Sequence, residues 1–387
     1  MKQVISFISL LILGQQVLSQ SSSSPSLNPK GKWMEIQAGG GLWSNTFTKS
    51  FVFENYWDET LINNTKQNAP QRIRGGYSVD ASIKIHFSDS IKERPFIIAG
   101  YQNIGGLSFH KNAVFSVLQG NAENKSVELK NSGFKQLSFS KIGVGFEKND
   151  DVNNLHYGIS MSALALFNYS SFHAKTGILT TSENADSIIG KDINAIFDKT
   201  GGGYGIGFDF FVKKQIEKQL FEISIENVGL LLLNKREQSV VTRNFVYEGF
   251  DITPSLFSKQ SIDVQDSIKN YVETKPKGQT PRGTFIPFTL KMRYTNQLSE
   301  FTTIQADLQY ISFPGFLPKI GLNYGFKSSI PGTLILVGAS GGGFGNYGLT
   351  FGLLSKNTRF TITGIEGLAS SNLPFYWSVG LESKIGL

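Results

Sequence analysis

The chain has 387 residues, of which 37 are basic and 30 acidic, and it contains no cysteine. The lack of cysteine excludes disulfides, thiolate metal sites, cysteine nucleophiles and a lipidated cysteine. The basic excess is mild and spread along the chain, which excludes the basic stripe of a nucleic-acid-binding protein. The 41 Gly, 31 Phe and 13 Tyr favour strands with tight turns.

The N-terminus has the layout of a secretory signal. Lys2 is followed by the apolar run Val4 to Leu13 and by a polar stretch that ends in Ser19-Gln20. This pattern predicts a signal peptide over residues 1–19, cleaved after Ser19. The apolar run is about half of the roughly 20 residues that a membrane-spanning helix needs. We expect residues 20–32 to form a periplasmic leader and residues 33–387 to form the membrane domain.

The clearest periodicity lies in Tyr77 to Phe87, where apolar and polar residues alternate strictly. The apolar face carries Tyr77, Val79, Ala81, Ile83, Ile85 and Phe87, and the polar face carries Ser78, Asp80, Ser82, Lys84 and His86. A tilted strand that spans a membrane has about 9–11 residues. Aromatic residues at both ends of the apolar face match the interfacial girdles of a barrel. The segment therefore predicts a transmembrane strand.

The same alternation recurs along the chain, in residues 155–167, 203–212, 288–295, 304–310, 320–326 and 347–353. Weaker candidates are 33–43, 95–104, 113–119, 134–146, 221–233, 240–250, 334–339 and 360–363. Because bacterial barrels have even strand numbers, we predict an all-β fold, a transmembrane antiparallel β-barrel of about 14 strands. Surplus strands are assigned to plug or loop hairpins. The last segment, Phe375 to Leu387, is expected to pair with the first strand and close the sheet.

Long polar segments separate the strands at residues 54–76, 121–132, 170–200 and 233–282. Barrels carry short periplasmic turns and long outer loops, so we expect these segments to be extracellular loops or insertions into the lumen. Within the last of them, the spacing of Leu256, Ile262 and Ile268 predicts a short helix over residues 255–272.

Two patterns that suggest chemistry have simpler interpretations. Gly343, Gly345 and Gly348 form a G-x-G-x-x-G, but the following residues continue with period two. We therefore expect a tight hairpin, or a position where side chains would collide in the lumen, and not a dinucleotide site. His86, His110, His156 and His173 lack metal or triad spacing. His86 and His156 are expected to make hydrogen bonds in the lumen, although a serine nucleophile paired with His156 stays open. We therefore expect no enzyme activity, no catalytic, cofactor-binding or metal residues, and no cofactor.

Charged residues occur on the inward faces of several predicted strands. They are Asp80, Lys84, Glu222, Glu226, Lys291, Arg293 and Asp307. Such charges either pair across a crowded lumen or line a water-filled path. Structural pairing is favoured, because only 17% of the residues are charged and the inner faces are rich in glycine.

Two segments carry a family likeness: residues 221–229, which contain S-I-E-N-V-G, and residues 245–251, which read F-V-Y-E-G-F-D. From about Trp33 onward the chain resembles a domain of unknown function in outer-membrane proteins of Bacteroidota. That family looks related to FadL-like and PorP/SprF-like barrels. The resemblance implies about fourteen strands and a lumen that a plug can close, and it supplies no catalytic residue.

The expected location is the cell outer membrane, with outer-membrane lipid and lipopolysaccharide as partners and no nucleic acid. The leading hypothesis is a non-enzymatic accessory or structural subunit of an envelope complex, for secretion and gliding or for barrel assembly. Its loop 251–282 would contact other envelope proteins. The alternative is a FadL-like transporter that passes a hydrophobic or small solute through its wall or lumen.

Overall fold

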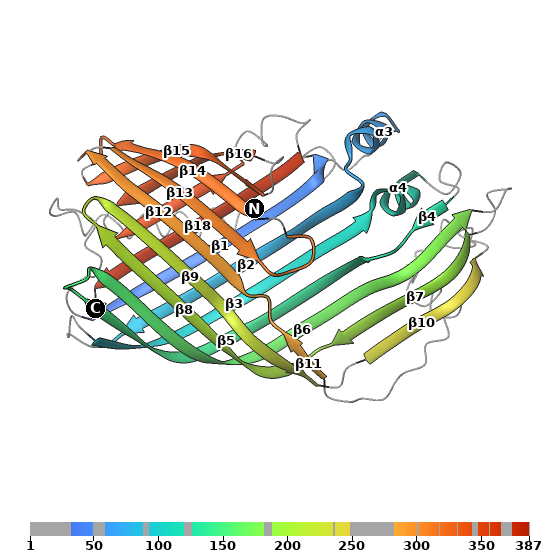
Figure 1. Ribbon diagram of the computed structural model, residues 1–387, viewed down its shortest axis with the longest axis horizontal. Helices are drawn as coiled ribbons and strands as arrows, with labels where there is room; N and C mark the ends of the chain where they lie inside the picture. Colours follow the sequence, from blue (N-terminus) through green and yellow to red (C-terminus); the bar gives the residue numbers. More distant parts are fainter. Residues whose placement is uncertain are drawn as a thin grey trace, which may run out of the picture.

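The chain folds into a closed β-barrel (Figure 1). The computed structural model describes residues 32–48, 59–87, 93–119, 126–181, 188–234, 237–247, 282–299, 302–316, 318–330, 332–342, 347–355, 357–364 and 374–386. The predicted signal peptide, the leader and the helix expected over residues 255–272 lie outside these ranges, as does nearly all of the loop 251–282.

Fourteen antiparallel strands form the wall in the described part of the chain. In ring order they are β1 (Trp33–Thr48), β2 (Arg72–His86), β3 (Glu93–His110), β5 (Ser132–Asp150), β6 (Leu155–Thr181), β8 (Gly203–Ile216), β9 (Gln219–Leu233), β12 (Thr289–Ser299), β13 (Thr302–Ile311), β14 (Lys319–Lys327), β15 (Thr333–Gly342), β16 (Tyr347–Ser355), β17 (Thr358–Thr363) and β18 (Pro374–Gly386). β18 pairs with β1 from Trp33↔Gly386 to Trp43↔Tyr376, which closes the ring. The predicted strand number and the closing role of the last strand are confirmed.

The remaining strands extend the wall at one end of the barrel. They are β4 (Ser126–Glu128), β7 (Ile188–Thr200), β10 (Glu237–Tyr247) and β11 (Arg282–Phe285). β7 continues the line of β8 along β6, because Thr200 pairs with Tyr169 and Gly203 with Leu166. β10 pairs in turn with β7. The surplus strands of the described chain are thus wall extensions, and the expectation of a polar loop over residues 170–200 was wrong.

Two helices lie at this same end, α3 (Glu59–Asn68) and α4 (Lys111–Gln119). Ile62 of α3 and Phe115 of α4 are buried together with Ile73 of β2. The expectation of a strand over residues 113–119 was therefore wrong. A short apolar run does not distinguish a strand from a helix, and tertiary burial of Phe115 decides the outcome here.

The two ends of the barrel differ. Trp33 and Gly386 lie at one end, together with the short turns at residues 151–154 and 217–218. The opposite end carries the helices and the extension formed by β7 and β10 (Figure 1). Barrels place short turns in the periplasm and long elements outside, so the helices and the extension are extracellular.

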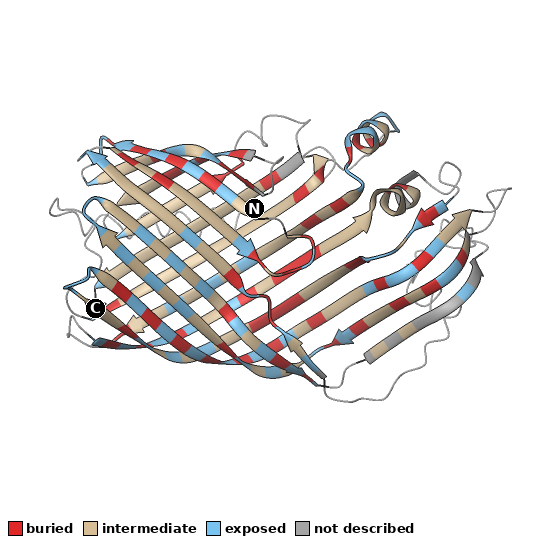
Figure 2. Cartoon of the chain, viewed as in Figure 1, coloured by how far each residue is buried: buried red, intermediate tan, exposed pale blue. Residues whose placement is uncertain are grey.

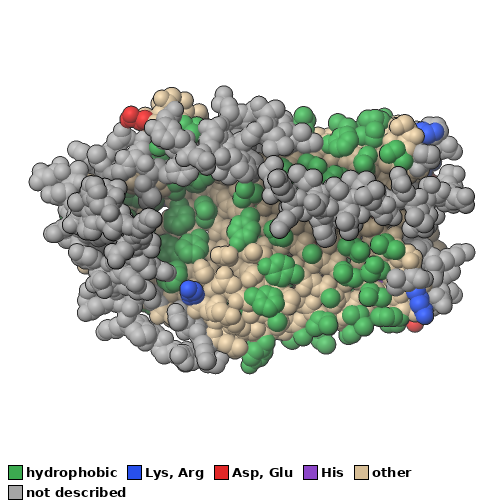
Figure 3. Space-filling view, turned by 180° about the vertical axis from the view of Figure 1, so that it is seen from behind, with side chains coloured by type: hydrophobic (Ala, Val, Ile, Leu, Met, Phe, Trp, Pro, Cys, Tyr) green, Lys and Arg blue, Asp and Glu red, His purple; other side chains and the backbone are tan. Residues whose placement is uncertain are grey.

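The outer surface of the wall is apolar. Alternate residues on each strand are exposed, and they include Val79, Ile83, Ile142, Ile223 and Leu322. Figure 3 shows hydrophobic side chains spread over one face with few charges among them, and Figure 2 shows exposed and buried residues alternating along the strands. No helix of the described residues is long and apolar enough to cross a membrane, a finding that does not bear on strands. An apolar belt around a closed sheet is the structure that lipid requires, so the protein is an outer-membrane barrel.

Candidate functional site in the barrel lumen

Arg293 is the centre of an ion-pair network in the periplasmic half of the lumen. Its Nε lies 2.9 Å from Asp307 Oδ1, its Nη1 lies 3.5 Å from Glu222 Oε2, and its Nη2 lies 3.3 Å from Glu382 Oε1. Glu382 belongs to β18, six strands away from β12 around the ring, so this last contact crosses the lumen. A guanidinium suits this position because it presents several donors in a fixed plane.

Further pairs complete what we call the ion-pair belt. Its members are Lys213, Glu222, Glu226, Lys291, Arg293, Asp307, Arg359 and Glu382. Lys213 Nζ lies 2.9 Å from Glu222 Oε1, and Lys291 Nζ lies 2.9 Å from Glu226 Oε2. Structural pairing, the favoured prediction for the inward charges, is confirmed for Glu222, Glu226, Lys291, Arg293 and Asp307. Lys213, Arg359 and Glu382 were not among the predicted inward charges, although each lies on an inward face that period two identifies.

The remaining predicted charges have other neighbours. The Lys84 ammonium lies over the rings of Phe96 and Phe211, 4.8 and 5.0 Å from their centroids. Asp80 lines a cavity described below. Both therefore lie in the lumen, as predicted, but no ion pair is recorded for them among the described residues.

Two histidines flank one carboxylate near the periplasmic end. Glu147 Oε1 lies 3.2 Å from His86 Nδ1, and Glu147 Oε2 lies 3.5 Å from His156 Nε2. The Trp33 ring stacks on His86 with 3.8 Å between centroids. All four side chains are buried. His86 and His156 lie in the lumen beside Glu147, as their place on the polar faces predicted, but among the described residues their ring nitrogens form ion-pair contacts and not the expected hydrogen bonds.

The S-I-E-N-V-G segment forms a β-bulge in β9. One extra residue is inserted opposite Phe208–Phe210, and Asn227 adopts a φ of 63°. The Asn227 N–H donates to Asp209 Oδ1 at 2.7 Å, and Lys141 Nζ donates to both Asn227 Oδ1 and Asp209 Oδ2 at 3.0 and 2.9 Å. Asparagine tolerates this backbone region better than most residues. The bulge turns the Asn227 side chain into the lumen, where its amide donates to Gln102 of β3 at 3.3 Å.

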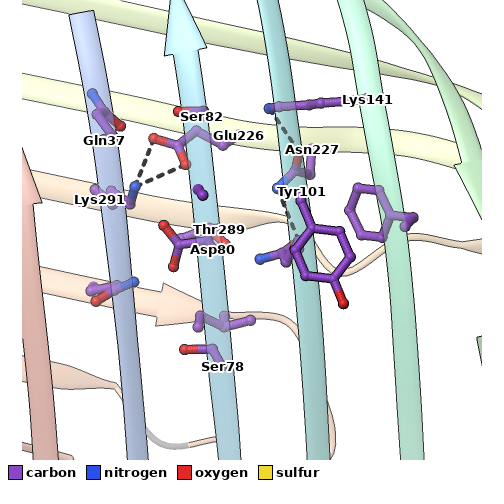
Figure 4. Close-up of a pocket in the computed structure, with 15 residues that line it drawn as sticks. Gln37, Ser78, Asp80, Ser82, Tyr101, Lys141, Glu226, Asn227, Thr289 and Lys291 are labelled. Carbon is purple, nitrogen blue, oxygen red and sulfur yellow. Dashed lines mark hydrogen bonds and ion pairs between the residues drawn. The ribbon is translucent and has the colours of Figure 1, made fainter. Parts of the chain in front are cut away.

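A polar cavity of about 50 Å³ lies beside the bulge (Figure 4). Lys291, Glu226, Asn227 and Lys141 point into it, and Asp80 lines it as well. This volume holds a few water molecules, since one water needs about 10–15 Å³ by this measure. Phe139 and Ile311 form its apolar side. The cavity thus marks the boundary between the ion-pair belt and an apolar region further toward the outside.

That region, which we call the apolar compartment, is a packed cluster of buried side chains on the lumen side of the wall, nearer the extracellular end. It consists of Ile104, Leu137, Phe139, Leu164, Leu166, Tyr169, Leu231, Leu233, Ile286, Ile311 and Phe313, with Phe316 packed against it. Most of these residues are inward members of β3, β5, β6 and β9. A barrel of this size usually has a polar interior. An apolar cluster on part of the lumen side of the wall is therefore a departure from this pattern.

Residues 312–316, which we call the strap, cover the apolar compartment on its extracellular side. The strap follows β13, and it reaches Gly76 of β2, seven strands away in either direction around the ring. A Cβ on Gly106 would overlap the Pro314 carbonyl oxygen, and a Cβ on Gly76 would lie 3.1 Å from the Phe316 ring. The Trp43 and Phe316 rings meet edge to face, 3.9 Å apart. The facing pair Gly76↔Gly106 thus provides the side-chain-free surface on which the strap rests.

The wall itself is interrupted beside this compartment. Between β11 and β12, residues 286–288 leave the regular ladder with β9, and we call this segment the wall break. Pro287 has no N–H to offer, and Ile286 N–H makes one bond, to the Gly229 carbonyl at 3.1 Å. The Ile286 side chain turns inward, is 3% exposed, and lies 3.4 Å from where a Gly207 Cβ would be. Ile286 therefore covers the place where the backbone pairing is weakest.

Neither a family model nor a curated protein matches the sequence. Among solved structures the chain is similar to the P. putida toluene transporter TodX, with 10% identity, 94% of this chain and 91% of that chain covered, and a TM-score of 0.41. It is similar to a Pseudomonas aeruginosa FadL homologue, with 8% identity, coverages of 92% and 90%, and a TM-score of 0.39. The translocator domain of the autotransporter NalP from Neisseria meningitidis shares 10% identity over 99% of this chain and 98% of that chain, at a TM-score of 0.35. The resemblance to Bacteroidota proteins and to PorP/SprF-like barrels stays a prediction.

Proposed function

We propose that this barrel is a non-enzymatic transporter that passes small apolar solutes from the outside into its lumen and releases them sideways through the wall break. The apolar compartment is the observation that carries the proposal. Binding sites for small molecules are mostly apolar and concave, whereas a barrel that only scaffolds other proteins has no need of an apolar lumen.

The direction of release follows from the two layers of the lumen. An apolar solute that continued toward the periplasm would have to enter the ion-pair belt, where Arg293 joins β12 to β18. Moving apolar surface among desolvated charges is unfavourable, because the charges would lose partners. Leaving through the wall at residues 286–288 requires that Ile286 move and that its one backbone bond to Gly229 break, and the solute then meets the apolar outer face near Val228 and Leu230. The lateral path is the less costly one.

The accessory-subunit hypothesis has less support. It depended on the loop 251–282, of which the structure describes only Arg282. The described residues form instead the apolar compartment, the strap and the wall break, which together suit passage of a solute.

Uptake of labelled toluene into proteoliposomes tests the proposal. Gly207→Ala should lower uptake severalfold, because its methyl group would lie in van der Waals contact with Ile286 and Leu164, at 3.4–3.5 Å, and hinder the movement of Ile286 that opens the break. Gly39→Ala is the control, since a Cβ there also meets only atoms at 3.5 Å, on the far side of the lumen. Slower gel migration after boiling would show that each variant is folded. Equal uptake by empty liposomes and by the wild-type protein would contradict the proposal.

A further inference from the structure

Lys135 lies against the apolar compartment, and its ammonium faces two rings. The Nζ atom is 5.4 Å from the Phe313 centroid and 5.7 Å from the Tyr169 centroid. Among the described residues no carboxylate lies within ion-pair distance of Lys135. A cation within about 6 Å of a ring centroid is attracted by the negative face of the ring. The two rings therefore stabilise this ammonium.

Phe313 reaches this place from the strap and not from a wall strand. It is 7% exposed and packs in the compartment with Ile104, Leu137 and Phe139, which belong to β3 and β5. The strap is well bonded at its start, where Ser312 exchanges two hydrogen bonds with Phe288 and the Phe313 N–H donates to the Ile311 carbonyl at 2.8 Å, but weakly bonded beyond it. Phe316 N–H donates to the Phe313 carbonyl at 3.2 Å within the strap itself, and Trp43 Nε1 reaches the Gly315 carbonyl only at 3.5 Å. Phe313 is thus a ring from the strap that lies in a site formed by residues of the wall strands.

We propose that Phe313 occupies a binding site for an aromatic ring, that an aromatic solute takes the same place when the strap moves away, and that Lys135 determines the preference for aromatic rings. This inference rests on the proposed transport function and names its solute class. Phe313 of the strap would compete with the solute for this site, and the strap would keep the compartment closed in the absence of solute.

The selectivity follows from the chemistry of Lys135. A saturated ring of the same size fills the same volume but has no negative face, so it leaves the ammonium with the Tyr169 ring as its one remaining aromatic contact of the two. Cation–π attraction at a partly desolvated site corresponds to about a threefold to tenfold preference. The shape of the site alone gives no such distinction between a flat ring and a saturated one.

A first experiment locates the site. Crystals of the full-length Phe313→Ala variant would be soaked with iodobenzene or with iodocyclohexane, and the iodine would be found by anomalous scattering. We expect iodobenzene between Lys135 and Tyr169, with an occupancy above that of iodocyclohexane at equal concentration. Adding Lys135→Met should remove the difference. Iodine found elsewhere, or equal occupancy of both compounds beside an intact Lys135, would overturn the proposal.

A second experiment leaves the strap intact and does not depend on the folding of Phe313→Ala. Uptake of toluene and of methylcyclohexane would be compared in proteoliposomes containing wild-type protein, Lys135→Met or Lys148→Met. Lys148 lies on the same strand, β5, and is 44% exposed, which makes it a matched control. The ratio of the two uptake rates should fall about threefold to tenfold in Lys135→Met only. An unchanged ratio would refute the role of Lys135.

The two experiments separate this inference from the proposed function. Uptake of both solutes without any effect of Lys135→Met, together with crystals that lack iodobenzene at the site, would leave transport standing and remove the aromatic site. Iodobenzene bound beside Lys135 without uptake by any variant would support the site and refute transport.

Discussion

Ser312 and Phe288 exchange two hydrogen bonds at the point where the strap meets the wall break. The Ser312 N–H donates to the Phe288 carbonyl at 3.0 Å, and the Phe288 N–H donates to Ser312 Oγ at 2.9 Å. The pair follows directly on Thr289↔Ile311 in the ladder of β12 and β13. The hydroxyl takes the place of a backbone carbonyl because the chain leaves the strand here and turns into the lumen. The strap and the wall break therefore share one hinge.

Ser312→Ala removes the acceptor of the Phe288 N–H. We expect a loss of about 1 kcal/mol in the free energy of unfolding, and a higher rate of toluene uptake because the hinge is loosened. Ser355→Ala is the matched control, since Ser355 Oγ accepts from the Thr358 N–H at 3.1 Å in a hairpin at the periplasmic end. Both variants should lose similar stability. Equal toluene uptake in the two would show that the hinge has no part in transport.

The two faces of β2 should respond differently to a charge. Ile83 is 43% exposed on the lipid side, so Ile83→Lys should cost roughly 2–4 kcal/mol near mid-bilayer. Ser82 lines the lumen cavity, where an ammonium finds water and the carboxylate of Glu226 nearby, so Ser82→Lys should be milder. Urea unfolding in lipid vesicles measures both. Equal destabilisation would mean that the outer face of the strand is not in contact with lipid.

Arg293→Met tests the ion-pair belt. The substitution leaves Glu222, Asp307 and Glu382 without their shared guanidinium, and we expect a loss of about 3 kcal/mol in unfolding free energy. It should also raise the ion conductance of the barrel in a planar bilayer, since the contact that crosses the lumen is lost. The control is Lys148→Met, which breaks the exposed pair with Glu93 and should cost at most about 1 kcal/mol. A conductance that stays at the wild-type level would mean that the belt does not close the lumen.

The backbone at Asn227 permits a narrower test. Asn227→Val places a β-branched residue at a φ of 63°, which should cost about 1–3 kcal/mol in addition to the lost side-chain bonds. Asn227→Gly loses the same side-chain bonds but has no such backbone cost, so it isolates the strain. Unfolding by urea should rank the glycine variant as the more stable. The reverse order would mean that the bulge has changed its conformation in response.

Period two in the sequence predicted which residues of a strand face lipid and which face the lumen, as Ile83 and Ser82 show. It also placed Arg293 and Glu222 correctly on inward faces. It could not show that Arg293 meets Glu382, because a contact across the lumen depends on the ring order and register of strands far apart in the sequence. The alternation itself is absent over residues 170–200, because an extension outside the membrane has no lipid-facing side to require it.

The strap and the bulge could not be predicted from the sequence, for different reasons. Ser312-Phe313-Pro314-Gly315 reads as an ordinary turn, and only closure of the barrel brings Phe313 against Lys135 and Tyr169. Asn227 belongs to a segment that was noted for its family likeness. The sequence of this segment does not indicate the positive φ of Asn227 or its hydrogen bond to Asp209.

Cross-linking the wall break tests most directly whether solutes leave through the wall. The native chain has no cysteine, so Val228→Cys with Phe288→Cys provides a single pair of thiols, one on each side of the break, that a short bifunctional maleimide can join. Toluene uptake by proteoliposomes would be measured before and after cross-linking, with the same pair treated with a monofunctional maleimide as control. Lateral release predicts that cross-linking abolishes uptake while the monofunctional reagent has little effect. Uptake that continues at the same rate after complete cross-linking would contradict it.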